Sequence, residues 1–324
     1  MIKPIMIYTG INEGHSVGQE LEYLLIKEGK VYDFIDLFAQ ELKLSLPWLN
    51  RKINSPKVYI DSWHLELCSS PHTNISDLYE EMAELYDAMS SKAKNKGLDI
   101  VKSSIYHFHN LAELNDTITQ VAGSHVHIGN PWLTRNKLLD ALTPYLPIFI
   151  ALANNSPTED FPKGSERLRN GLFSKDLEKN KDRRGRAIHK HKNAPTIEVR
   201  CLDRAKTLEE DIANAAFVYA TAEKLKEDIR FFNFSQNLMN DNFCGLYLTN
   251  GRFNQESLLT FTKLLMQRAT NEAFDANIDL RAKNNFSQKT LRDVTKQHYA
   301  NIKNKLHEIH TPKHLIKILE RKIL

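Results

Sequence analysis

Four short segments in the first part of the chain alternate between polar and apolar side chains. They are QELEYL (residues 19–24), WHLELC (63–68), SHVHIG (124–129) and TIEVRCL (196–202). A period of two is typical of a β-strand, because successive side chains of a strand point to opposite faces of the sheet. Each segment is therefore predicted to be a strand with one polar and one apolar face.

The stretches around these segments also have the character of strands. Residues 16–26 are predicted to form one strand, and KVYDFID (30–36) follows it across Glu28-Gly29, which favours a hairpin. Strands are also expected within residues 57–71, 98–107, 117–130 and 194–203. Strands are therefore expected to dominate the first two hundred residues.

Other stretches show the three-to-four residue spacing of amphipathic helices. Residues 74–97 have one apolar stripe and end at Gly97, a typical helix stop. The stripe consists of Leu78, Met82, Leu85 and Met89. Residues 133–155 are predicted to be helical, with a break near two prolines. A long helix follows Thr207, which forms a capping box with Glu210, and the pattern is helical from about residue 254 onward.

This arrangement predicts an α+β protein with a largely antiparallel sheet, because helices do not alternate one by one with strands. We expect a single domain over residues 1–324. Residues 1–232 are predicted to form its sheet core with inserted helices, and residues 233–324 a helical C-terminal part.

Composition excludes several classes of protein. Hydrophobic residues make up 41% and charged residues 26%, which is ordinary for a globular protein. The 44 basic and 40 acidic side chains are too balanced to indicate nucleic-acid binding. No apolar run reaches the length of a membrane span, the N-terminus lacks a signal peptide, and the three cysteines are sparse. We therefore expect a cytoplasmic protein that binds neither nucleic acid nor membrane.

The polar faces of the four alternating segments carry unusual residue types. They hold Glu20, Glu22, His64, Glu66, His125, His127, Glu198 and Arg200. A face exposed to water would be expected to carry Lys, Thr, Ser and Gln, whereas all of these residues except the arginine can bind a divalent cation. Carboxylates gathered on one sheet face would repel one another unless cations lay among them. The pattern favours a shared metal site.

Carboxylates outnumber histidines in this set, which favours magnesium, with manganese as the alternative, over zinc. A divalent metal beside an arginine is typical of phosphoryl transfer, in which both neutralise negative charge. The chain has no Walker loop, so the phosphates would be held in some other way.

Five motifs, taken in their order along the chain, resemble the motifs of a known family. They are ELEYLL, HLELCSSP, SHVHIGNP, ALANNSPTEDFPKGSERLRNG and TIEVRCLD, within about residues 17–225. The series resembles the glutamate–cysteine ligase family of carboxylate–amine ligases, in its shorter bacterial form. The resemblance implies the fold of the glutamine synthetase catalytic domain, an antiparallel sheet cupped around the active site, with flanking helices.

The resemblance also implies an activity and its substrates. ATP would phosphorylate a carboxylate, commonly the γ-carboxylate of glutamate, and cysteine or another amine would attack the acyl phosphate to form an amide. The expected partners are thus small molecules (ATP, an amino acid carboxylate and an amine), and a homodimer is left open.

Residue roles carry over from the matching motifs. Glu22, Glu66, His127 and Glu198 would bind magnesium, with Glu20 as a further ligand beside Glu22. Arg200 would stabilise the phosphoryl group in transfer, and Arg169, or alternatively Arg167, would hold a substrate carboxylate or phosphate. His125 is expected to contact substrate or ATP, and His64 to support Glu66 by a hydrogen bond. Cys68 stands where the family often has an aliphatic residue or threonine.

The segment 178–193 is rich in lysine and arginine and has two interpretations. It is either a solvated loop or a lid in which Arg183, Arg184 and Arg186 contact the ATP phosphates. RNA binding is disfavoured, because no aromatic residues interrupt the charges.

Two other function classes compete with the ligase. A metal-dependent hydrolase or cupin-like oxygenase could use the His125-x-His127 pair, although the glutamate that a cupin needs shortly afterwards is missing. The chain could also be a non-catalytic binding protein that has kept the fold, but every expected ligand and Arg200 are present.

Overall fold

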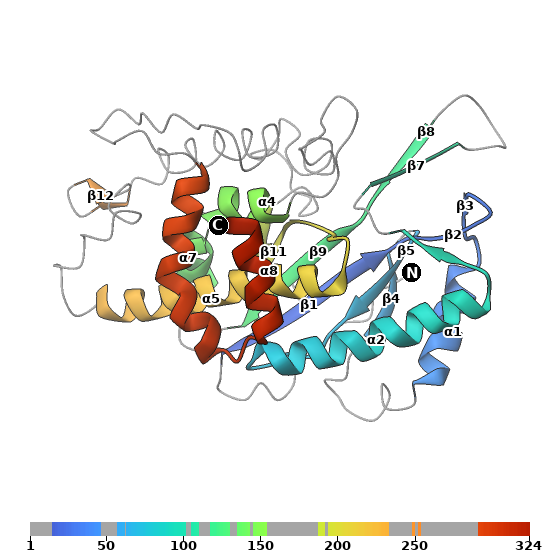
Figure 1. Cartoon of the computed structure of the whole chain (residues 1–324), viewed down its shortest axis with the longest axis horizontal. Helices are drawn as coiled ribbons and strands as arrows, with labels where there is room; N and C mark the ends of the chain where they lie inside the picture. The colour runs from blue at the N-terminus through green and yellow to red at the C-terminus, as the bar shows by residue number, and fades with distance from the viewer. Residues whose placement is uncertain are drawn as a thin grey trace.

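The computed structural model describes most of the sheet core and the last two helices. The described residues are 15–46, 57–61, 63–101, 105–109, 117–129, 135–142, 145–153, 187–191, 194–232, 248–249, 252–253 and 291–324. Among them is a six-stranded sheet in the order β10-β11-β9-β1-β5-β4 (Figure 1). Its strands are β1 (Ser16–Tyr23), β4 (Lys57–Asp61), β5 (His64–Cys68), β9 (Gly123–Gly129), β10 (Ile188–Lys190) and β11 (Thr196–Asp203).

Every pair of neighbouring strands in this sheet is antiparallel. The predicted α+β class with a largely antiparallel sheet is therefore confirmed. The four alternating segments form β1, β5, β9 and β11, which are adjacent in the centre of the sheet.

The register of the strands aligns their polar positions. Glu20 lies opposite Cys68 on one side and His125 on the other, and Glu22 lies opposite Glu66. His127 lies opposite Glu198. Because paired residues of neighbouring strands point to the same face, the register gathers these side chains on one face.

The other face of the sheet is apolar and is covered by helices. Leu21, Leu67 and Val126 are completely buried there. Helix α2 (Ile75–Asn95) contacts β1 and β5, α5 (Leu208–Phe232) contacts β9, and α7 (Leu291–Glu308) and α8 (Lys313–Ile323) pack against α5 (Figure 1). The helices thus form the layer that removes the apolar face from water.

The helix signals in the sequence match these boundaries. The predicted stripe of α2 is fully buried. Asn74 accepts a hydrogen bond from the Asp77 amide at its start, and Gly97 follows its end with a φ of 65°. Thr207 Oγ1 accepts a hydrogen bond from the Glu210 amide, so this half of the predicted capping box is present. The expected break near the prolines separates α3 (Arg135–Leu142) from α4 (Leu146–Ala153).

A small sheet beside the main one contains the predicted hairpin. Strands β2 (Leu25–Lys27) and β3 (Lys30–Val31) join through Glu28 and Gly29, both of which have positive φ angles, and β6 (Asp99–Ile100) pairs with β2. The prediction of a strand over residues 30–36 is wrong beyond Val31. The strand ends at this residue, and helix α1 (Ile35–Ser45) begins at Ile35. The buried residues of α1 recur at helical spacing, and this longer pattern prevails over the local one.

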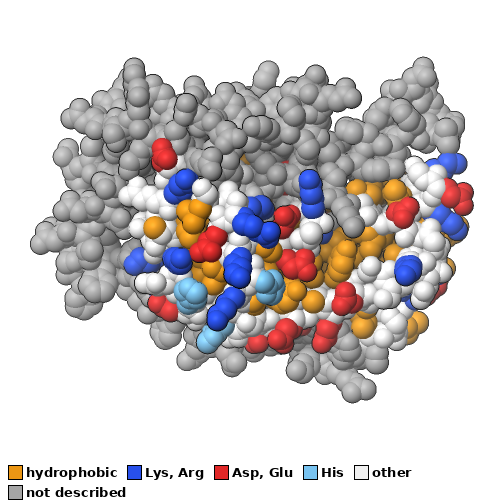
Figure 2. Space-filling model, in the orientation of Figure 1, with side chains coloured by type: hydrophobic (Ala, Val, Ile, Leu, Met, Phe, Trp, Pro, Cys, Tyr) orange, Lys and Arg blue, Asp and Glu red, His pale blue; other side chains and the backbone are white. Residues whose placement is uncertain are grey.

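The remaining strands form two small pairs apart from the main sheet. Strands β7 (Ile105–His109) and β8 (Thr117–Val121) form one hairpin, and β12 (Leu248–Thr249) and β13 (Arg252–Phe253) form another. The second hairpin lies within the predicted C-terminal part, just before the helical pattern that is expected from about residue 254. On the face seen in Figure 2, acidic and basic side chains are mixed with apolar ones. None of the described helices combines the length and the apolar character that crossing a membrane requires.

Candidate active site

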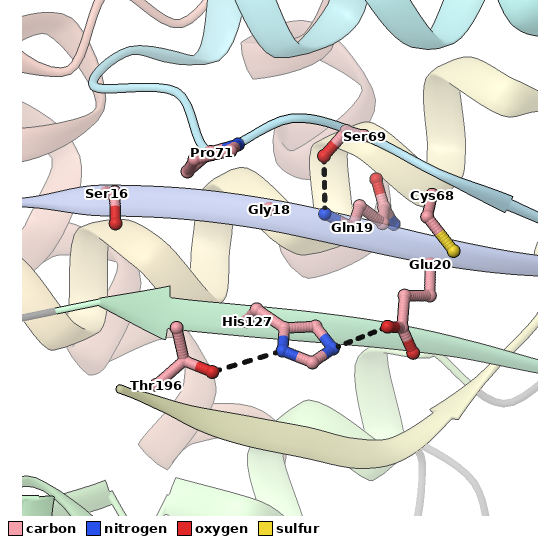
Figure 3. Close-up of a pocket in the computed structure, with 9 residues that line it drawn as sticks. All are labelled: Ser16, Gly18, Gln19, Glu20, Cys68, Ser69, Pro71, His127 and Thr196. Carbon is pink, nitrogen blue, oxygen red and sulfur yellow. Dashed lines mark hydrogen bonds and ion pairs between the residues drawn. The ribbon is translucent and has the colours of Figure 1, made fainter. Parts of the chain in front are cut away.

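Glu20 of β1 is the centre of the polar face. Its Oε1 lies 3.2 Å from His127 Nε2, and its Oε2 lies 3.4 Å from His125 Nδ1. On the far side of the His127 ring, Nδ1 lies 3.2 Å from Thr196 Oγ1 (Figure 3). The carboxylate and both imidazoles of the H-x-H motif therefore form one contiguous group.

Glu198 of β11 closes this group from the next strand. Its Oε1 lies 3.6 Å from His125 Nδ1 and 3.4 Å from Arg200 Nε. One ligand atom each of Glu20, His125 and Glu198 lies within 4.8 Å of the other two, so these three side chains could hold one cation. Arg200 stands at the edge of the same group and is partly exposed.

A second set of carboxylates lies along the sheet toward β4. Glu22, Asp61 and Glu66 each offer an oxygen within 4.8 Å of the other two. Glu22 Oε2 also accepts a hydrogen bond of 2.6 Å from the Gly123 amide, and Glu66 Oε1 accepts one of 3.1 Å from Cys68 Sγ. These are two of the places that the polar face offers for a cation, and a third includes Cys68. We call the two sets, together with His127, the metal cup.

Burial and mutual repulsion dominate the electrostatics of the cup. Burial raises the pKa of Glu66 well above its usual range, and the carboxylates of Glu20 and Glu22 raise it further. Burial also opposes ionisation of Glu20, but His127 and His125 outweigh it and hold the pKa of Glu20 well below normal. The cup thus contains more negative charge than its own cations balance.

The histidines respond to the same charges. Burial lowers the pKa of His127, but the Glu20 and Glu198 carboxylates reverse this and raise it to about 9. His125, His127 and Arg200 in turn hold the pKa of Glu198 below normal although burial opposes this. The surroundings of His127 therefore favour a positive charge at its position.

Three residues of the cup were missed by the sequence interpretation. His189 Nε2 lies 3.2 Å from Glu198 Oε2, and the His191 ring packs edge-on against His127 with centroids 5.2 Å apart. Their HKH repeat was included in a basic loop, but residues 188–190 form β10, paired with β11. The spacing of two between His189 and His191, the same as in His125-x-His127, was the available signal. Asp61 was missed because it is the last residue of β4, and the other polar residues of that strand, Lys57 and Tyr59, are not typical metal ligands.

The other predicted site residues have different outcomes. His64 is buried, and its Nε2 forms no hydrogen bond within the described part of the chain, so the expected bond from this atom to Glu66 is not observed. Five predicted residues lie outside the described residues, and their roles stay predictions. They are Arg167, Arg169, Arg183, Arg184 and Arg186.

Comparisons with known proteins agree with the motifs. No family model matches the chain. Two curated proteins with the name "Putative glutamate–cysteine ligase 2", from Bordetella avium (strain 197N) and Bordetella petrii, are 29% identical to it over 162 residues. The match covers 44% of this chain and 39% and 38% of those proteins, so it spans about two fifths of their length.

A solved structure extends the likeness to nearly the whole chain. The crystal structure of glutamate–cysteine ligase from Francisella tularensis in complex with AMP aligns with a TM-score of 0.54. The alignment covers 96% of this chain and 81% of that one, at 12% identity, and so it concerns the fold alone. The chain therefore has the fold of a glutamate–cysteine ligase, and its resemblance to that family of carboxylate–amine ligases, which five motifs predict, is confirmed.

Proposed function

We propose that this protein is an ATP-dependent ligase that joins the γ-carboxylate of glutamate to the amino group of cysteine or another small amine. The observation that carries the proposal is the metal cup. One face of the sheet brings together buried carboxylates, two imidazoles and Arg200. This set suits a nucleoside triphosphate bound through divalent cations. The partial match to the Bordetella proteins supports the choice of substrates.

The cup residues fit magnesium. Most of their donor atoms are carboxylate oxygens, which magnesium prefers, and a dication would relieve the repulsion of Glu66 by the Glu20 and Glu22 carboxylates. Glu22, Asp61 and Glu66 would hold one ion, and Glu20, His125 and Glu198 another. Bound magnesium supplies positive charge that bridges and neutralises the ATP phosphates.

The chain's own residues would then orient the reactants. Arg200 is partly exposed beside Glu198, so its guanidinium can reach a phosphoryl group bound over the cup. Its planar fork of N–H donors matches phosphate oxygens and stabilises the charge that develops there during transfer. His189 contacts Glu198 from the neighbouring strand β10, and this contact restricts the rotation of the Glu198 carboxylate.

The proposed reaction has two steps. A carboxylate oxygen of glutamate attacks the γ-phosphorus of ATP, the bond to the bridging oxygen breaks, and ADP leaves. The amine nitrogen then attacks the acyl carbon, phosphate departs with the C–O bonding pair, and the nitrogen loses a proton to solvent. Because water would hydrolyse the acyl phosphate, the site has to exclude water until the amine binds.

A phosphate-release screen tests the proposal. The full chain would be incubated with ATP and magnesium, with glutamate or aspartate, and with a panel of amines that includes cysteine. We expect release that requires ATP, acid and amine together and that stops when EDTA removes magnesium. If no acid–amine pair stimulates release although ATP binds, the protein is a binding protein. If zinc or iron is present after purification and esters or amides are cleaved without ATP, it is a hydrolase.

A further inference from the structure

Cys68 brings a sulfur atom into the metal cup. It lies on β5 directly opposite Glu20 of β1, and its Sγ is 3.1 Å from Glu66 Oε1. Figure 3 shows its side chain above Glu20, in the pocket that Glu20 and His127 also line. The thiol is 3% exposed, so it faces this pocket and not the outer surface.

The donor atoms around Cys68 are of three kinds. One ligand atom each of Glu20, Glu66 and Cys68 lies within 4.8 Å of the other two. An imidazole nitrogen lies beside this set, because Nε2 of the buried His127 is 3.2 Å from Glu20 Oε1. Oxygen, nitrogen and sulfur within one small pocket form a mixed donor set, which is more specific than a cluster of carboxylates.

Zinc prefers such a set, whereas magnesium does not bind sulfur. Zn–S and Zn–O bonds of about 2.3 and 2.0 Å in a tetrahedral site place the sulfur and the oxygen roughly 3.5 Å apart. The 3.1 Å separation of Cys68 Sγ and Glu66 Oε1 is within a few tenths of an ångström of that value. Only small side-chain rotations would be needed to enclose an ion.

We propose that Cys68, Glu20 and Glu66, with His127 beside them, form a binding site for a thiophilic divalent cation of the zinc type. On binding, the S–H bond of Cys68 breaks, the sulfur pair forms the bond to the metal, and the proton passes to water, as does any proton held by the Glu66 carboxyl or the His127 ring. Glu20 and Glu66 also belong to the two groups assigned to magnesium, so zinc in this site excludes magnesium and inhibits the enzyme. The inhibition rests on the proposed ligase function, but the binding site does not.

Cobalt(II) is the probe, because cobalt substitutes for zinc and gives a near-ultraviolet charge-transfer band only when a thiolate is bound to it. Metal-free protein would be titrated with cobalt in the absence of ATP. The chain has two further cysteines, Cys201 in the hydrophobic core and Cys244 outside the described residues. The double variant Cys201→Ser/Cys244→Ser therefore leaves Cys68 as the sole thiol.

We expect this double variant to show the thiolate band at one cobalt per chain and to lose it when zinc is added. Adding Cys68→Ser should abolish the band and weaken zinc binding by at least about tenfold to a hundredfold, which is the loss when even an outer-shell partner of a metal is removed. Circular dichroism would verify that the triple variant is folded.

Absence of the band from the wild-type protein and from the double variant would overturn the proposal, whether or not the triple variant folds. A band that persists after Cys68→Ser would also overturn it. These spectra require no turnover, so failure of the zinc site and failure of the ligase function are distinguishable. If both hold, zinc should inhibit magnesium-dependent phosphate release in the double variant more strongly than in the triple variant, relative to each protein's own uninhibited rate.

Discussion

The two faces of the central sheet are buried to a similar degree but have opposite chemistry. On one face Leu21, Leu67 and Val126 are completely buried under helices. On the other, Glu66 is 9% exposed and Glu198 only 4%. Burial of an apolar side chain stabilises the fold by roughly 1.5–3 kcal/mol, whereas burial of a carboxylate costs free energy unless partners compensate. The apolar face therefore holds the protein together, whereas the polar face contributes little to stability, which agrees with the binding role proposed for it.

The partners within the cup compensate only in part. Glu20 and Glu198 face histidines, but Glu66 faces two other carboxylates and a thiol, and its pKa is raised. A sheet selected for stability alone would replace these groups with apolar ones, since buried ion pairs seldom stabilise more than good packing does. Single substitutions on adjacent positions of one strand should therefore separate activity from stability.

The largest effect is expected from Glu66→Gln, which keeps the shape of the side chain but removes a charged ligand. Turnover in the phosphate-release assay should fall below detection, because one of the proposed magnesium groups loses a ligand. The melting temperature of the metal-free variant should stay equal or rise, since repulsion from Glu20 and Glu22 is relieved. Normal turnover in this variant would contradict the assignment of the cup.

The matched change on the opposite face is Leu67→Ala, one residue further along β5. It should lower the free energy of unfolding by about 2–5 kcal/mol, because it leaves a cavity under the helices. Denaturant unfolding monitored by circular dichroism measures this loss. Turnover per folded molecule should stay near that of the wild type, and a loss as complete as that of Glu66→Gln would show that the two faces are not separable.

Arg200→Lys should have an intermediate effect, confined to the transition state. Lysine keeps the charge but lacks the planar fork of donors. Turnover should fall by roughly tenfold to a thousandfold, while the affinity for ATP changes much less. Nucleotide titration and steady-state kinetics together check this. The reverse result, weak ATP binding with normal turnover, would make Arg200 a ground-state anchor.

The smallest effect at neutral pH concerns a polar group on the helical side, His298 of α7. Burial lowers its pKa to about 3, and Thr221 Oγ1 accepts a hydrogen bond from Nε2 while donating its own proton to the Phe217 carbonyl. Below pH 6.5 the unfolded chain binds a proton at this residue and the folded chain does not. The stability that the neutral ring contributes is therefore complete above pH 6.5 and declines as the pH falls toward 3.

The expected slope from this one group is about 1.4 kcal/mol per pH unit within that window. Denaturant unfolding at several pH values, compared between the wild type and His298→Gln, isolates it, because glutamine keeps a donor for Thr221 but does not titrate. Curves that stay parallel from pH 7 to pH 4 would show that His298 is protonated in the folded protein.

The sequence by itself determined the strands, their two faces and the chemical character of each face. A period of two specifies where a side chain points without any knowledge of its neighbours, so the polar sets on β1, β5, β9 and β11 were predictable residue by residue. The buried stripe of α2 was predictable in the same way, from the helical period of about 3.6 residues. The order of five motifs then indicated the family and its fold.

Only the tertiary structure decided which strands are neighbours and in which register. Pairing of β10 with β11 brings His189 to Glu198, and the turn between β4 and β5 brings Asp61 to Glu22 and Glu66. Periodicity along one strand carries no information about the partner strand, because register depends on packing between residues distant in sequence. The same non-local packing placed Cys68 opposite Glu20, and so determined that the metal cup contains a thiol.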